Sequence, residues 1–334
     1  MLSSAAEKKI DFRLEEFLTA DADGMVREGK VPVIVMFNAD APDSSDRLFS
    51  DDQISKDLSV KYRFHLIPGL AGEACCKSIR KMAESEWVSG IYFDDVAQIS
   101  SLNSNTFTNS SMESSVAQNE YYDRYISPAQ IIKADKLWEK GINGTGITVA
   151  VIDSGIDKNH PDLIGKVVAE KNFLADEITA DDLLGHGTMV AGIIAGSGAA
   201  SNGSYKGIAP GAKLISVKVI DGNGDGKVSD IIAGIEWAVY NRADILSLSL
   251  GGINLGETNP PITMAADNAA SAGVVVCVAA GNRNSSETGG QISDSSSSQV
   301  RENQIGKGQL DYSKAGNSRT SVKLSQSDGS TKKD

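Results

Sequence analysis

An aspartate and a histidine in this chain have the types and settings needed for acid–base chemistry. Asp153 ends an apolar run and is followed by a Ser-Gly turn, and His186 lies between two glycines at the start of a run of small residues. Flanking glycines let the backbone turn sharply and leave the imidazole accessible. An accessible histidine acts as a general base, and a nearby carboxylate orients it and stabilises its charged form. Taken separately, each residue also fits an ordinary turn or helix start.

The elements that would hold these two residues can be predicted from the residues around them. The run 146–153 is apolar on both faces, which predicts a buried parallel strand. Open α/β sheets place their sites at the carboxyl ends of such strands, where Asp153 falls. After His186, residues such as Ala191 and Gly192 predict a slim helix that lies close against the sheet.

These stretches resemble the subtilisin-like serine proteases (subtilases). The family's order of Asp, then His, then Ser separates it from chymotrypsin-like and α/β-hydrolase enzymes. The resemblance spans about residues 125–282, with further matching blocks at residues 160–163, 205–212, 247–252 and 279–282. It implies a serine endopeptidase that cuts protein or peptide substrates, with His186 as the general base and Asp153 as its orienting carboxylate.

The resemblance also implies a substrate groove and an oxyanion donor. Asn282 matches the asparagine of the family's oxyanion hole. Two glycine-containing strand ends match the edges that line the S1 pocket and hold the substrate backbone as an added strand. The residues of these edges are Ser249, Leu250, Gly251, Ala279, Ala280 and Gly281. Ordinary termination of a strand by glycine is the alternative.

No cofactor is expected for the chemistry, although structural calcium is compatible with the family. Asp162 matches a carboxylate that many subtilases use as a calcium ligand. Residues 221–226 look like the first half of an EF-hand loop, but Ile232 occupies the position where a bidentate glutamate is needed. By family position this loop is expected to border the S4 subsite.

The family's nucleophile block, of the Gly-Thr-Ser-Met-Ala type, does not occur in residues 283–334. The nearest segment, around Ser321, lacks the glycine, the alanine and the apolar helix. The composition of this tail is polar and predicts disorder. Two explanations are a truncated or frameshifted protease, which we favour, and an inactive pseudoprotease that acts as a peptide-binding or protease-inhibitory module.

The first hundred residues predict a small separate module. A helix is expected over 7–18. The module itself is expected to be a split βαβ unit with the order β-α-β-β-α-β. Its elements are predicted at 31–37, 51–58, 62–67, 72–85, 88–93 and 97–100. This module resembles the subtilase propeptide, which inhibits the protease domain of its own chain and assists the folding of that domain. Residues 101–120 are predicted to be a polar linker, and in the family the propeptide is cleaved off near such a linker.

The remaining pattern alternates helices with strands, which predicts an α/β fold with a doubly wound parallel sheet. Helices are expected at 128–140, 229–240 and 261–272, and further strands at 213–220, 243–250 and 273–279. The predicted organisation is an extension (1–30), the propeptide-like domain (31–100), a linker (101–124), the front of the catalytic domain (125–282) and the tail (283–334).

Composition and charge indicate which classes of binding partner and which compartments are compatible with this chain. A net charge of −12 argues against nucleic-acid binding, and no apolar run is long enough to span a bilayer. Three cysteines form neither a disulfide framework nor a zinc spacing. The N-terminus has no apolar core of the signal-peptide kind, so the compartment stays open. A monomer is expected.

Overall fold

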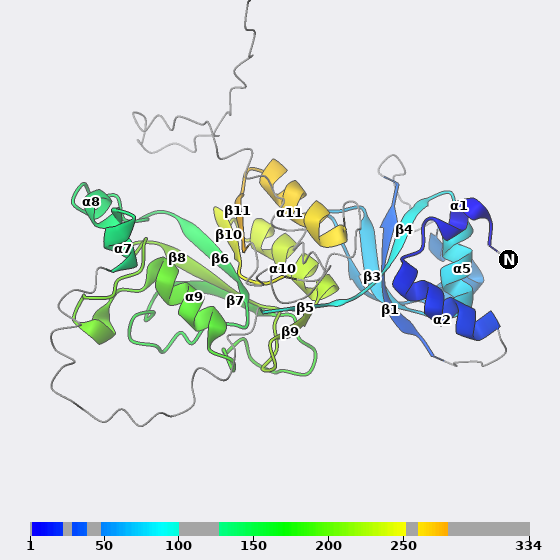
Figure 1. Ribbon diagram of the computed structural model, residues 1–334, viewed down its shortest axis with the longest axis horizontal. Helices are drawn as coiled ribbons and strands as arrows, with labels where there is room; N and C mark the ends of the chain where they lie inside the picture. The colour runs from blue at the N-terminus through cyan, green and yellow to red at the C-terminus, as the bar shows by residue number, and fades with distance from the viewer. Residues whose placement is uncertain (1, 23–28, 39–47, 100–126, 252–259, 280–334) are drawn as a thin grey trace, which may run out of the picture.

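The computed structural model describes residues 2–22, 29–38, 48–99, 127–251 and 260–279. They form two units arranged along the long axis of the molecule (Figure 1). We call the described residues between 2 and 99 the first unit and those between 127 and 279 the second unit. Within the described residues, no helix has the length and apolar character needed to cross a membrane.

The first unit is a four-stranded antiparallel sheet with the strand order β2-β3-β1-β4. From β1 to β4 its described elements run β-α-β-β-α-β, the order expected of a split βαβ unit, although the predicted ranges had placed the second helix before the third strand. The elements are α1 (Ser4–Glu7), α2 (Phe12–Ala22), β1 (Val31–Phe37), α4 (Asp52–Asp57), β2 (Ser59–Arg63), β3 (Gly69–Ala74), α5 (Cys76–Glu84) and β4 (Val88–Phe93).

The helix predicted over 72–85 was wrong at its start, because the chain forms β3 before α5 begins. Gly72 permits this strand: a Cβ there would collide with the backbone of Ser59 on β2, so only glycine allows the two strands to approach. The second strand also lies earlier than the predicted 62–67.

The single helix predicted over 7–18 is in fact two helices. Between α1 and α2 the chain runs beside β4, where Ile10 forms a bridge with Ile91 and Asp11 N donates to Ile91 O at 2.9 Å. Ile10 and Leu14 are buried in the same core as β1 and α5, so the N-terminal segment packs as part of the first unit.

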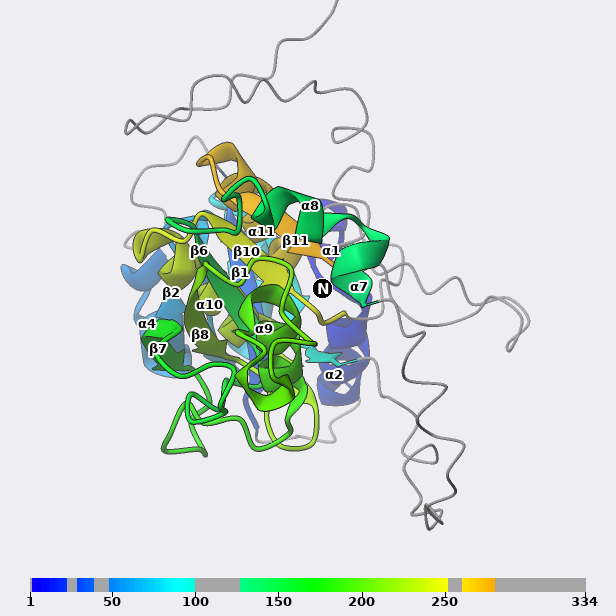
Figure 2. The same cartoon turned by 90° about the vertical axis from the view of Figure 1, so that its left-hand side faces the viewer.

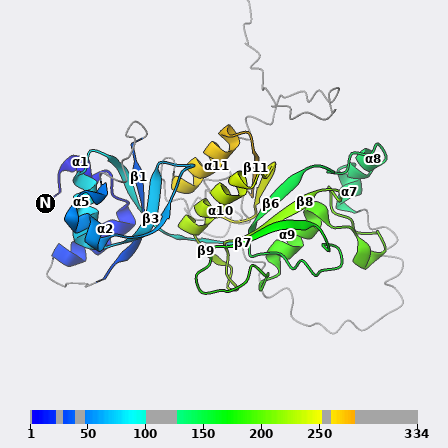
Figure 3. The same ribbon diagram turned by 180° about the vertical axis from the view of Figure 1, so that it is seen from behind.

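Side chains of β1 alternate between two cores. Val33 and Val35 pack in the core that the first unit makes with its own helices. Ile34 and Met36 point to the opposite face and belong to a core that also contains residues of the second unit, including Ile231. A strand has a side-chain period of two, so β1 is buried on both faces. Figures 1 and 3 show α10 and α11 between the two sheets.

The second unit is built on a five-stranded parallel sheet with the order β11-β10-β6-β8-β7. Its helices cover both faces, which confirms the predicted doubly wound α/β class. The elements are α7 (Pro128–Ile131), α8 (Ala134–Trp138), β6 (Thr148–Asp153), β7 (Val167–Asn172), α9 (His186–Ala195), a 3-10 turn (Ala199–Ser201), β8 (Lys213–Lys218), β9 (Asp225–Lys227), α10 (Val228–Tyr240), β10 (Ile245–Leu248), α11 (Pro261–Ser271) and β11 (Val275–Val278).

The alternation along β6 separates the two faces of this sheet. Val149 and Val151 pack with α9, whereas Ala150 and Ile152 pack with α10 and α11. Figure 2, which looks along the long axis, shows α9 in front of β6 and β8. The helix predicted over 128–140 is interrupted at Lys133, whose φ of 63° is left-handed and separates α7 from α8.

Candidate active site

Asp153 is held rigidly at the carboxyl end of the parallel sheet. It is the last residue of β6 and is fully buried. Its backbone carbonyl accepts hydrogen bonds from Val219 N at 2.9 Å and Ile220 N at 3.2 Å, just beyond β8. The strand and these two bonds therefore fix the backbone from which the carboxylate extends.

His186 begins α9, and the start of this helix lies directly against the turn after β6. A Cβ at Gly187 would collide with the carbonyl oxygen of Gly155. Gly155 itself has a φ of +105°, a conformation that other residues rarely adopt. The two glycines thus allow the close approach that brings the histidine to the aspartate.

The imidazole and the carboxylate are in hydrogen-bond contact. His186 Nδ1 lies 2.8 Å from Asp153 Oδ1 and 3.0 Å from Oδ2. The hydrogen bond to Asp153 raises the pKa of His186 above its usual value, although partial burial works in the opposite direction. Since Nδ1 is engaged with the carboxylate, Nε2 is the ring nitrogen that can take a proton from a reacting group.

A second carboxylate, Asp182, organises the backbone around the histidine. Its Oδ1 accepts from Ser154 Oγ at 2.8 Å and from Gly185 N at 2.8 Å, while its Oδ2 accepts from both the backbone N and the hydroxyl of Thr188. Ser154 Oγ in turn accepts from Gly187 N at 3.0 Å. Burial opposes ionisation of Asp182, but these hydrogen bonds prevail and lower its pKa.

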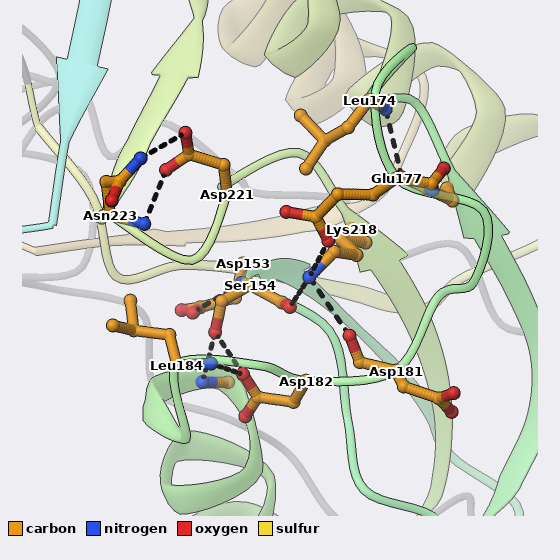
Figure 4. Close-up of polar contacts among 12 residues, drawn as sticks. Asp153, Ser154, Leu174, Glu177, Asp181, Asp182, Leu184, Lys218, Asp221 and Asn223 are labelled. Atoms are coloured by element: carbon orange, nitrogen blue, oxygen red, sulfur yellow. Dashed lines mark hydrogen bonds and ion pairs between the residues drawn. The ribbon is translucent and has the colours of Figure 1, made fainter.

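Sequence reasoning did not single out Ser154, Asp182 or Lys218. Lys218 ends β8 and is completely buried beside the turn that follows Asp153 (Figure 4). One signal was available for Lys218, because a lysine within an apolar run is rarely buried unless it has partners. Ser154 and Asp182 resemble ordinary turn residues in the sequence, so nothing there distinguished them.

The first predicted substrate-binding edge follows β10, the strand beside β6, and Ala279 of the second edge follows β11, one strand further along the sheet. β10 is the neighbour of β6, and Leu248 pairs in register with both Ile152 and Val278. Leu250 is buried, Ser249 and Gly251 are partly buried, and Ala279 is exposed. The carboxyl ends of β6, β10 and β11 therefore meet at one edge of the sheet. Ala280, Gly281, Asn282 and Ser321 lie outside the described residues.

A strand from the first unit occupies this edge. β5 (Val96–Gln98) pairs antiparallel with β9, and Gln98 also exchanges backbone hydrogen bonds with Gly251, at 2.9 and 3.1 Å. The loop at 221–226, predicted to border a subsite, leads into β9 and so into this pairing. An extended segment thus lies between β9 and Gly251, with backbone groups paired to both.

Asp162 has a structural role in the described residues. Its Oδ1 accepts from Ala200 N at 2.8 Å, and its backbone carbonyl accepts from Ser197 N at 3.0 Å. Three or more His, Cys, Asp or Glu side chains do not gather into a metal-binding group anywhere in the described ranges. The carboxylate of Asp162 therefore orders the segment after α9, and its predicted part in a calcium site is untested.

Comparisons with known proteins agree with the motifs. The family model described as Subtilase family (Peptidase_S8) matches residues 144–329, more than half of the chain, and extends beyond Asn282. The major intracellular serine protease of Bacillus subtilis (strain 168) is 45% identical over 158 residues, which are 46% of this chain and 48% of that protein. Subtilisin E of the same strain is 46% identical over 158 residues, which are 46% of this chain and 39% of that protein.

The shared fold extends over more of the chain than the shared sequence does. Fervidolysin from Fervidobacterium pennivorans, a keratinolytic enzyme related to subtilisin, superposes with a TM-score of 0.54 at 24% identity, covering 78% of this chain and 42% of that one. The chain spans half or less of the length of these relatives. The family match and the parallel sheet give the same answer: this chain belongs to the subtilase family.

Proposed function

We propose that this chain carries the acid–base half of a subtilisin-like serine endopeptidase. His186 is the general base that takes the proton of the nucleophile, and Asp153 orients the imidazole and stabilises its charged form. The 2.8 Å contact between His186 Nδ1 and Asp153 Oδ1 at the carboxyl edge of the sheet carries this proposal. Asn282 is the proposed oxyanion donor. The proposed substrates are proteins or peptides, and the chemistry needs no cofactor.

The proposed substrate groove is the space between β9 and Gly251 that β5 now occupies. An extended peptide added there gains backbone hydrogen bonds on both sides, as this segment does where Gln98 bonds to Gly251 and Ile99 N donates to Gly224 O. The first unit accordingly acts as a propeptide that docks in cis and blocks the groove. Its sheet supports this, because Ile34 and Met36 are buried in a core that also contains residues of the second unit.

The activity expected of this sequence depends on whether it contains the nucleophilic serine. That sequence has no Gly-Thr-Ser-type block after Asn282, so we propose that it forms no acyl-enzyme by itself. A fluorophosphonate probe should leave it unlabelled. A labelled band that disappears with Ser321→Ala would show that this serine is the nucleophile.

A frameshift near codon 283 is the proposed origin of the missing block. Reading the other two frames of the coding sequence downstream of this codon should reveal a Gly-Thr-Ser block followed by an apolar helix. The frameshift proposal fails if neither frame contains one.

Self-processing gives a second test of the proposal that this sequence lacks a nucleophile. Without a nucleophile the chain does not cut its own linker, so intact mass after expression in a protease-deficient host should equal that of the whole chain. A discrete product that begins between residues 105 and 124 would contradict this and would require a working nucleophile.

The alternative function is a peptide-binding or protease-inhibitory module. The pairing of β5 with β9 favours it, because the groove accepts an extended segment without any bond being cut. A pull-down against active subtilases, with a casein cleavage assay on the same sample, separates the two. Capture and inhibition of an active subtilase without casein cleavage would support the module; cleavage would support the peptidase.

The proposed calcium ligand Asp162 is tested by calcium titration, and the proposed monomeric state is tested by light scattering.

A further inference from the structure

A completely buried lysine lies behind the Asp153–His186 pair. Lys218 Nζ donates to Ser154 O at 2.6 Å and to Asp181 O at 3.0 Å, and lies 3.1 Å from Glu177 Oε2. The ammonium group has three N–H donors, and these three oxygens use all of them. Figure 4 shows the three acceptors converging on the nitrogen from different segments.

The acceptors come from the two segments that carry the acid–base pair. Ser154 follows Asp153 directly, and Asp181 precedes Asp182, which binds the backbone at the start of α9. Lys218 itself pairs in register with Asp153 on one side and with Asn172 on the other. The lysine therefore joins the turn after β6 to the loop that leads into His186.

The loop is also held from the other side of Lys218. Asn172 Nδ2 donates to Glu177 O at 2.6 Å, and Leu174 N donates to Asn172 Oδ1 at 2.9 Å. These two bonds fix the backbone of the turn, so Glu177 is held where its carboxylate meets the ammonium. The ion pair is thus part of a folded loop and does not depend on one flexible side chain.

A buried charge is a costly way to fill this position. Removing an ammonium from water costs several kcal/mol, which attraction to a partner offsets only with good geometry and full hydrogen bonding. The neighbouring residue Val217 shows that an apolar side chain fits the same strand. What an apolar side chain lacks is a donor for the carbonyl oxygens of Ser154 and Asp181.

We propose that Lys218, held by Glu177, is a positioning residue that sets the distance between Asp153 and His186. The catalytic meaning of this inference rests on the proposed function. The geometry that it predicts does not, because that geometry can be measured on the imidazole of His186 without any catalysis. Fluorophosphonate labelling and casein cleavage test the function separately, so either proposal can fail alone.

The test uses Lys218→Met and the double variant Lys218→Met/Glu177→Leu in the full chain. The single variant leaves Glu177 without its partner and should lower the thermal midpoint by more than about 6 °C. The double variant removes both charges, recovers part of that loss and so provides a folded sample. Lys158→Met is the matched control, because Lys158 pairs with Glu170 on the surface, and its midpoint should change by less than about 4 °C.

The deciding readouts are the titration of His186 and the low-field proton resonance of its Nδ1–H. The double variant removes one positive and one negative charge and so leaves the net charge near His186 unchanged, whereas a longer hydrogen bond to Asp153 would lower the pKa of His186. We expect the pKa to fall toward its ordinary value in the double variant and the resonance to weaken, with neither change in Lys158→Met. A pKa and a resonance that match the wild type in the double variant would overturn the proposal and leave Lys218 a stabilising residue only.

Discussion

The two larger sheets of the described residues are both covered on both faces, but by different parts of the chain. The parallel sheet of the second unit is covered by its own helices, α9 on one face and α10 and α11 on the other. The antiparallel sheet of the first unit is covered on one face by its own helices and on the other by α10 and α11 of the second unit. The first unit therefore buries one face of its sheet in a core that it shares with the second unit.

The direction of the strands explains where chemistry is found. In the parallel sheet the carboxyl ends of neighbouring strands meet at one edge, which brings Asp153 beside Lys218 and places Leu248 beside Ile152. Neighbouring strands of the antiparallel sheet end at opposite edges, so they do not gather side chains in this way. Instead, the antiparallel sheet offers a broad apolar face, which suits a docking partner.

The largest expected effect is on the free energy of unfolding, and it distinguishes the two cores to which the first unit contributes. Ile34→Ala, in the shared core, should lower the free energy of unfolding by about 2–5 kcal/mol and shift the unfolding of both units. Ile91→Ala, in the first unit's own core, should cost a similar amount but act chiefly on that unit. The fluorescence of Trp87 and of Trp237, each in a single-tryptophan variant, reports the two units separately. If Trp237 does not respond to Ile34→Ala, the sheets are not coupled through this core.

A smaller effect is expected where the first unit caps a helix of the second. Asp94 is buried and accepts from Ser229 N at 2.8 Å and Ser229 Oγ at 2.7 Å, at the start of α10. Asp94→Ala should cost about 1–2 kcal/mol in chemical denaturation, because it leaves buried donors without an acceptor. Asp95→Ala is the control, since Asp95 is partly exposed. Equal losses in the two variants would mean that the cap does not contribute.

The parallel sheet should show its own dependence on pH. The pKa of His186 is raised in the folded chain, so protonation of this residue stabilises the fold. That contribution is fully present below about pH 6.5, the unfolded value, and is lost as pH rises through the folded pKa. Urea unfolding of wild type and His186→Gln across this range should therefore give a stability difference that shrinks with rising pH. A difference that grows would contradict the sign of the shift.

The smallest predicted effect concerns the second carboxylate of the site. Asp182→Asn removes a negative charge that contributes to the raised pKa of His186, so this pKa should fall by less than it does when Asp153 loses its charge. Nuclear magnetic resonance titration of the imidazole measures both. A larger fall for Asp182→Asn would make Asp182 the main partner of the histidine.

Local patterns in the sequence predicted much of the second unit. The apolar run before Asp153 and the small residues after His186 placed a strand and a helix correctly, because burial on both faces and close packing each leave a local signature. The predictions were weaker where a distant contact decides. The sequence pattern placed Gly72 in a helix. The need for glycine there comes from Ser59 on a neighbouring strand, which a Cβ at position 72 would meet, and no local pattern shows this contact.

The contacts between the units could not be predicted for the same reason. β9 is three residues long and forms only because β5 lies beside it, and no pattern within 225–227 announces a strand. Lys218 was visible as a lysine in an apolar run, but its three acceptors lie in segments far along the chain. A periodicity shows which side chains are buried and leaves open which partners they meet.

The most direct test of the account is the titration of His186 in wild type and in Asp153→Asn. If the carboxylate at the end of β6 orients the histidine as a general base, the pKa of His186 is raised in the wild type and falls in the variant, because a neutral amide no longer favours the charged imidazole. Unfolding curves of the two proteins confirm that both are folded at each pH. An identical pKa of His186 in the two proteins would contradict the proposed acid–base pair.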